Sequence, residues 1–158
     1  MRGLRVWCLS VACLAASPCL AEKTVKMVGN FVLVVDQDPF SGDARAVAQV
    51  KIGDDIVVLR CLENSLSVAI IRDHPMWGSN EDFKVSFRAD DGGTTELEGV
   101  ALAADTIGLY DSSRLFDAMI GASSVAFRVK WLASSYSFRI HISQVDKVIA
   151  EVKEVCGN

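Results

Sequence analysis

The chain has 158 residues, of which 51% are hydrophobic and 23% are charged, and its formal net charge at pH 7 is −4. A length of this order fits one domain with a single core. The acidic balance and the dispersed basic residues disfavour a nucleic acid or an anionic membrane as partner, because phosphate binding needs a clustered basic surface.

The first 21 residues have the layout of a secretory signal peptide. Arg2 and Arg5 give a positive start, residues 6–16 are apolar, and the small residue Ala21 precedes the expected cut. Pro18 ends the apolar run before it reaches the ~20 residues that a membrane-spanning helix needs. We therefore expect a cleaved signal over 1–21 and no stable membrane insertion after cleavage.

The remaining residues, 22–158, are expected to form one β-rich domain in the periplasm or outside the cell. Removal of Arg2 and Arg5 takes the basic count from 16 to 14 against 20 acidic residues, so the net charge of this part is −6. Acylation of Cys13 or Cys19 would instead tether the domain to a membrane. Pro18 directly before Cys19 and the short apolar run before Cys13 disfavour this alternative.

Short runs of apolar and β-branched residues follow one another along 22–158, as expected of strands. In 83–88, Phe83, Val85 and Phe87 alternate with polar residues, which is typical of an antiparallel strand with one buried face. The nearly continuous apolar run over 56–62 instead predicts a central strand that is covered on both faces. The expected strands lie near 31–35, 45–51, 56–62, 66–71, 83–88, 95–101, 106–109, 125–131 and 136–142.

Two segments have helical spacing. One follows a cap at Asp111 or Ser112, and Gly121 is a plausible stop. The other is expected to begin after an N-cap at Ser143 and places Cys156 on its apolar stripe. The sequence therefore predicts an α+β fold that is mainly β, an antiparallel sandwich-like domain with two short amphipathic helices.

The cysteines divide into two groups. Three of the five lie in the expected signal peptide, which leaves Cys61 and Cys156 in the domain. In an oxidising compartment the simplest interpretation is one structural disulfide, which would stabilise the fold by about 2–4 kcal/mol. A pair of free buried thiols is the alternative.

No catalytic set or metal centre is predicted. The histidines, His74 and His141, lack further ligands at the spacing that a zinc site needs. The acidic pairs stand at expected turns, where acidic residues are common. With both cysteines bonded, no thiol nucleophile would remain, so we expect no cofactor and no enzymatic activity.

Four residues are candidates for binding. The segment from Asp73 to Asn80 reads as a long loop, and it carries His74 and Trp77, so it is the first choice for a recognition element. Arg88 and Asp90 project to one side at the end of a strand. They would form an exposed ion pair or bind a charged group of a partner.

Short motifs resemble those of the TagO/VasI-type family and related bacterial periplasmic proteins. They are Val-Leu-Arg-Cys at 58–61, Phe-Arg-Ala-Asp at 87–90, a turn at 38–42, and a last helix that ends in Cys156 and Gly157. The family is associated with type VI secretion. The resemblance implies a periplasmic β-sandwich-like domain with one disulfide and no known chemistry.

Three functions are weighed. The leading hypothesis is a non-enzymatic periplasmic accessory or binding protein, whose partner is an envelope or secretion-system protein. The second is an inhibitor that inserts the 73–80 loop into the cleft of an envelope or host enzyme such as lysozyme. The third is an envelope hydrolase that uses a carboxylate together with His74.

Overall fold

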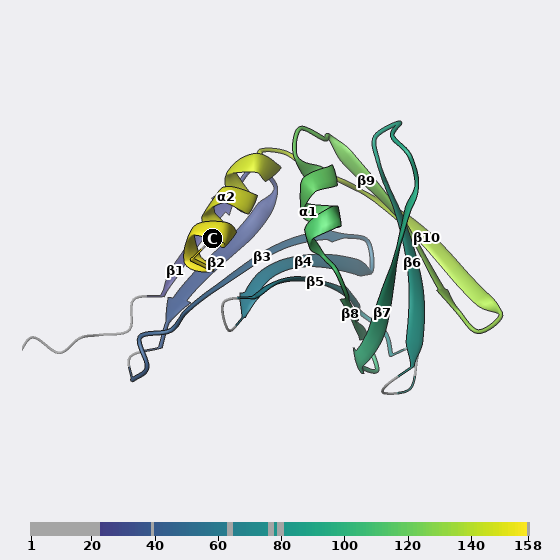
Figure 1. Ribbon diagram of the computed structural model, residues 1–158, viewed down its shortest axis with the longest axis horizontal. Coiled ribbons are helices and arrows are strands. Elements are labelled where there is room, and N and C mark those ends of the chain that lie inside the picture. Colours follow the sequence, from purple (N-terminus) through teal and green to yellow (C-terminus); the bar gives the residue numbers. More distant parts are fainter. Residues whose placement is uncertain (1–22, 39, 63–64, 76–77, 79–80, 158) are drawn as a thin grey trace, which may run out of the picture.

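The computed structural model describes residues 23–38, 40–62, 65–75, 78 and 81–157. They form one antiparallel sheet and two helices (Figure 1). The strands are β1 (Thr24–Val28), β2 (Phe31–Gln37), β3 (Ala44–Ile52), β4 (Asp55–Leu62), β5 (Ser65–Arg72), β6 (Asp82–Ala89), β7 (Thr95–Ala103), β8 (Thr106–Leu109), β9 (Ser124–Trp131) and β10 (Ser134–His141). The helices are α1 (Ser113–Met119) and α2 (Val145–Val155).

The strand order is β1-β2-β3-β4-β5-β8-β7-β6-β9-β10. β1 to β5 are successive antiparallel neighbours, and the chain then passes over two strand positions to reach β6. β7 and β8 return toward β5, so β8 pairs with β5 and closes the gap. Helix α1 carries the chain back to β9, which pairs with β6. Two strands far apart in the sequence therefore become neighbours.

The sheet is strongly bent, and both helices lie on its concave side (Figure 1). We call this side the inner face and the other side the outer face. Alternation along each strand sends one set of side chains inward, where they form a single core with the helices. The largest fully buried side chains include Phe31, Phe83, Phe116, Phe127, Leu59 and Met119.

A disulfide fixes α2 to the inner face. Cys61 on β4 is bonded to Cys156 at the end of α2, and their Cα atoms are 5.6 Å apart. Both residues are buried. The expected disulfide and the expected mainly β, sandwich-like fold with two short helices are confirmed. The two layers of the sandwich come from one continuous bent sheet.

The two ends of the bent sheet meet at the turn between β1 and β2. The Asn30 side chain donates to the carbonyl of His141 (2.6 Å) and accepts from the Ser143 backbone N–H (2.9 Å). Gly29 has φ +61°, and a Cβ there would overlap the backbone of Ser143. This turn therefore holds the beginning of the sheet against the end of β10.

Two details differ from the sequence-based expectation. β1 was not expected, although it pairs with β2 along its whole length. Ser143 is not the N-cap of the last helix, since Gln144 with φ 56° has that position and no side chain caps the helix. The reason is that the Ser143 backbone N–H and hydroxyl both point to Asn30.

The expected signal peptide over 1–21 lies outside the described residues. Within the described ranges, no helix has the length and apolarity needed to cross a membrane.

Candidate functional site

The outer face of β6, β9 and β10 carries a group of arginines that the strand pairing brings together. Arg88 on β6 lies opposite Ala126 on β9, which lies opposite Arg139 on β10. Two residues along, Arg128 on β9 lies between Ser86 and Ser137. Large and small side chains therefore alternate both along and across the three strands.

This alternation leaves a hollow of about 440 Å³, lined by Ser86, Phe87, Arg88, Thr94, Ala126, Phe127, Arg128, Ser137, Phe138 and Arg139. Ser86, Ala126 and Ser137 are too short to fill the surface, so the longer arginine side chains surround an open floor. The three phenylalanines point to the inner face by alternation, so they contribute backbone to the floor. We call this feature the arginine hollow.

The arginines of the hollow are exposed, and two of them donate to serine hydroxyl groups. Arg128 Nε donates to Ser137 Oγ, and Arg139 Nη1 donates to Ser124 Oγ, each at 3.3 Å. Among the described residues, no carboxylate forms an ion pair with Arg88, Arg128 or Arg139. The hollow is therefore a concentrated positive charge on a chain whose net charge is negative.

The acidic groups nearest in the sheet are occupied by other partners. Glu96 on β7 lies opposite Ser86, and its carboxylate pairs with Lys84 Nζ at 3.5 Å. Asp90, just after β6, accepts four hydrogen bonds from the backbone N–H and hydroxyl groups of Ser123 and Ser124, at 2.8–3.0 Å. These hydrogen bonds, those from Ser123 foremost, lower the pKa of Asp90 to about 2.

The structure separates the two residues that the sequence placed together. No ion pair joins Arg88 to Asp90 among the described residues, because Asp90 has φ 43° and turns its carboxylate toward Ser123 and Ser124. Asp90 therefore anchors the start of β9 to the end of β6. Arg88 instead belongs to the arginine hollow.

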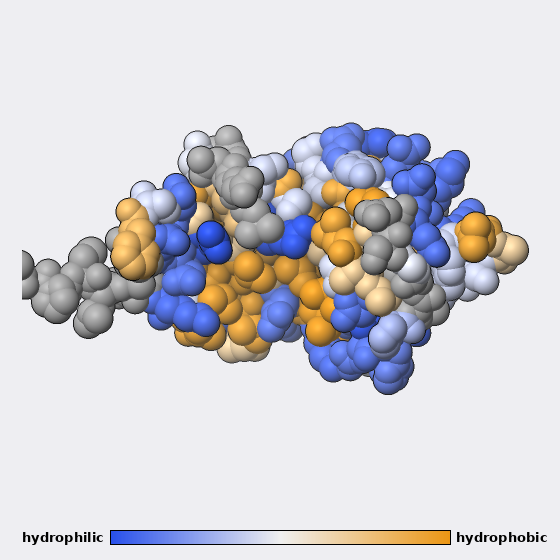
Figure 2. Space-filling view, turned by 90° about the horizontal axis from the view of Figure 1, so that it is seen from below, coloured by the Kyte–Doolittle hydropathy of each residue, from blue (hydrophilic) through white to orange (hydrophobic). Residues whose placement is uncertain are grey.

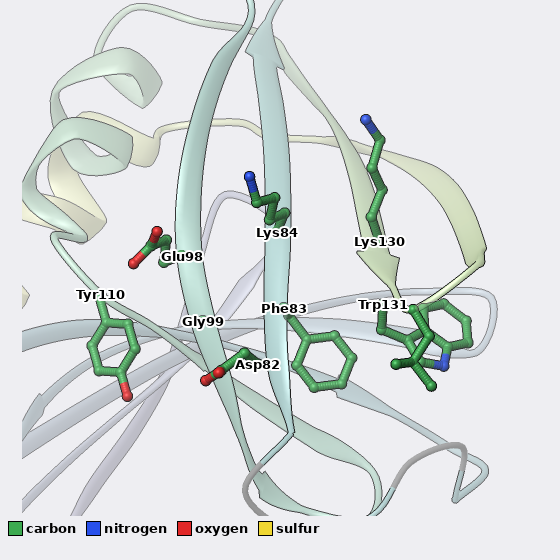
Figure 3. A pocket seen from close by; sticks show the side chains of 9 residues that line it. Asp82, Phe83, Lys84, Glu98, Gly99, Tyr110, Lys130 and Trp131 are labelled. Atoms are coloured by element: carbon green, nitrogen blue, oxygen red, sulfur yellow. The ribbon is translucent and has the colours of Figure 1, made fainter.

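A second hollow, of about 460 Å³, lies farther along β6 and β9 (Figure 3). Asp82 and Glu98 line it together with Lys84 and Lys130. In Figure 3 the rings of Phe83 and Trp131 lie next to each other on one side of it, with centroids 6.3 Å apart. Because both signs of charge line this hollow, it favours no one class of ion.

A polar cluster lies between the two layers of the sandwich. Arg72 at the end of β5 lies over the ring of Tyr136 on β10, at 4.2 Å from the centroid, and its Nε is 4.0 Å from Asp55 Oδ1. Burial raises the pKa of the Asp55 carboxyl, and burial also raises the pKa of Tyr136 to about 12, with Asp55 adding to the effect. This cluster joins β4 and β5 to the β9–β10 hairpin across the inner face.

The outer face of the other half of the sheet, β1 to β5, is rich in aliphatic side chains. Figure 2 shows hydrophobic side chains gathered at the centre of this side of the molecule. The register places on one face Val25, Met27, Val32, Val34, Val47, Ile56, Val58, Ala69, Ile71 and Val100, with Gln49, Lys51, Arg60 and Ser67 among them. Val25 and Met27 on the edge strand β1 are 58% and 64% exposed. We call this set the apolar outer face.

The loop residues that the sequence favoured are only partly described. His74 is exposed and follows Asp73, whose carboxylate accepts from Lys51 Nζ at 2.6 Å. Trp77 lies outside the described residues. Arg128 and Arg139 were not candidates, because they lie 40 and 51 positions after Arg88 and only strand pairing reveals their proximity.

In the part of the chain that the structure describes, no three His, Cys, Asp or Glu side chains are grouped so that they could hold a metal ion. Comparisons with protein-family models, with curated proteins and with solved structures gave no match.

Proposed function

We propose that the chain is a non-enzymatic accessory protein of the bacterial cell envelope that binds a partner protein through the apolar outer face. The observation that carries the proposal is the exposure of Val25 and Met27 next to the partly exposed aliphatic side chains of Val32, Val34 and Val47 on β2 and β3. Soluble monomers rarely expose a large contiguous apolar patch, and such patches mark interaction sites.

The partner is inferred to be a different protein with an aliphatic surface. The chain is acidic, with a formal net charge of −4. Copies of an acidic chain repel one another, which disfavours self-association through this face. Charge complementarity thus favours a neutral or basic partner.

The cellular setting of the proposal comes from the sequence. A signal-like start, a disulfide and the resemblance to TagO/VasI-type proteins support an exported envelope protein, with type VI secretion as the system it would assist. Disulfides persist in oxidising compartments such as the periplasm.

The test is affinity capture from an envelope extract, followed by direct binding of the identified partner in purified form. A V25E/M27E variant should weaken partner binding by about 100-fold, because two charges would be buried without partners. The control is F40E/L132E, which adds the same charge at residues that are 98% and 95% exposed.

Three results would contradict the proposal. One is a partner that binds V25E/M27E as tightly as it binds the parent. The second is equal loss of binding in F40E/L132E. The third is a dimer of the purified protein, measured by sedimentation, that V25E/M27E dissociates, since a second copy would then occupy the face.

A further inference from the structure

We propose that the arginine hollow is a binding site for a phosphate group. This inference is independent of the protein partner proposed above, because it rests on the outer face of β6, β9 and β10. The ligand class is a phosphate monoester or diester, either free or as the headgroup of a lipid.

The spacing of the arginines suits one small anion. Arg88 and Arg139 flank Ala126 from the two strands on either side of β9, so their backbones are about 10 Å apart. Arg128 comes from β9 itself, in the adjacent cross-strand row. All three side chains line one hollow, whose small floor residues leave room for a group that contacts each of them.

Within the described ranges, the arginines of the hollow have no direct ion-pair partner, and Ser124 separates the one nearby carboxylate, Asp90, from Arg139: its hydroxyl accepts from Arg139 Nη1 and donates to Asp90 Oδ1. Among the described residues no carboxylate pairs with the three guanidinium groups, and the neighbouring Glu96 and Asp90 are held by Lys84 and by two serines. An incoming anion therefore meets cations that need not first release an ion-pair partner. Ser86 and Ser137 add hydroxyl groups at the floor.

The number of guanidinium groups favours phosphate over a single carboxylate. One arginine already satisfies both oxygens of a carboxylate in a bidentate pair. A phosphate offers more oxygens and, as a monoester, close to two negative charges, so it can bind several arginine side chains at once. Three arginines around one hollow therefore match a phosphate better than a carboxylate.

The experiment is a titration of backbone amide NMR shifts with inorganic phosphate, at fixed ionic strength, using the purified disulfide-bonded protein. Shifts should saturate at the lining residues of β6, β9 and β10. An R88Q/R128Q variant should bind phosphate about tenfold more weakly or not at all. The control R45Q/R114Q removes two exposed arginines elsewhere and should change the affinity less than about twofold.

A second arm separates the two sources of phosphate. Vesicles of phosphatidylglycerol are compared with vesicles of phosphatidylcholine by co-sedimentation of the parent, R88Q/R128Q and R45Q/R114Q. Binding to phosphatidylglycerol that only R88Q/R128Q loses identifies a lipid headgroup, whereas a response to inorganic phosphate alone identifies a soluble ligand. Either result supports the phosphate site.

Absence of both responses would overturn the inference, as would equal weakening in R45Q/R114Q, which would show that only overall charge matters. The amide spectrum of each variant reports whether it is folded. If R88Q/R128Q does not fold, the single variants R128Q and R139Q replace it, and an unchanged phosphate affinity in both would count against the site.

Discussion

The two halves of the outer face have the same backbone architecture and opposite surfaces. On β1 to β5 valine and isoleucine are the commonest outward side chains, whereas on β6, β9 and β10 most outward side chains are arginine, lysine or serine. Inside, both halves contribute equally apolar side chains to one core. The inner face therefore specifies the fold, and the outer face is where the halves differ in what they can bind.

The disulfide joins β4 to α2, on the inner side of the apolar half of the sheet. Its removal should have the largest effect on stability. C61S/C156S is expected to lower the free energy of unfolding by about 4 kcal/mol, because the bond closes a loop across 95 residues. Hydrogen exchange should accelerate more in α2 and β1 to β4 than in β6, β9 and β10. Equal acceleration in both halves would show that they unfold as one unit, which would contradict a difference in stability between them.

A substitution at the turn between β1 and β2, where the two edges of the sheet meet, should have the second-largest effect on stability. G29A should destabilise the protein by about 3 kcal/mol, because alanine disfavours φ +61° and its Cβ would overlap the Ser143 carbonyl. G42A, at φ +78° with open space around it, is the matched control and should cost less. Denaturant unfolding of both variants measures the difference, and equal losses would show that only the backbone angle matters.

A substitution of Asp90, which lies in the cationic half, should have the smallest effect on stability, and that effect should depend on pH. Its pKa is lowered to about 2 from 3.8, so its charge stabilises the folded state above pH 4 and this contribution is lost as the pH falls toward 2. D90N keeps a residue that tolerates positive φ but removes the charge. Its Tm should be lower than that of the parent by a few degrees at pH 7.

The two melting curves should converge between pH 4 and pH 2, when the parent carboxylate becomes protonated. D82N, which removes a charge at the exposed first position of β6, is the control for the change in net charge. A constant difference between parent and D90N across this range would show that the hydrogen bonds with Ser123 and Ser124 do not depend on the charge.

Most elements could be predicted from the sequence because their signals are local. The alternation of Phe83, Val85 and Phe87 and the position of Gly121 after a helix are examples that the structure confirms. β1 was missed because only one of its residues, Val28, is buried, so it lacks an inward apolar alternation. The cap at Ser143 was wrong because Asn30, over a hundred residues away, binds that serine.

The candidate site shows the same division. Arg88 was found in the sequence as an outward residue at a strand end, and the outward positions of Arg128 and Arg139 follow from alternation within their own strands. Their shared hollow does not follow, since it depends on β6 pairing with β9 and not with β5. Without that pairing, the basic residues of the chain look dispersed.

The sequence by itself determined the β-rich class and the inward and outward faces of the strands, and it favoured the Cys61–Cys156 disulfide because these are the two cysteines outside the expected signal peptide. The physical reason is that periodicity and residue chemistry act over a few neighbouring positions. Only the tertiary structure decided the strand order, the bend that brings Arg72 over Tyr136, and the separation of an apolar from a cationic outer half. Those features depend on which distant strands share hydrogen bonds, which no local pattern encodes.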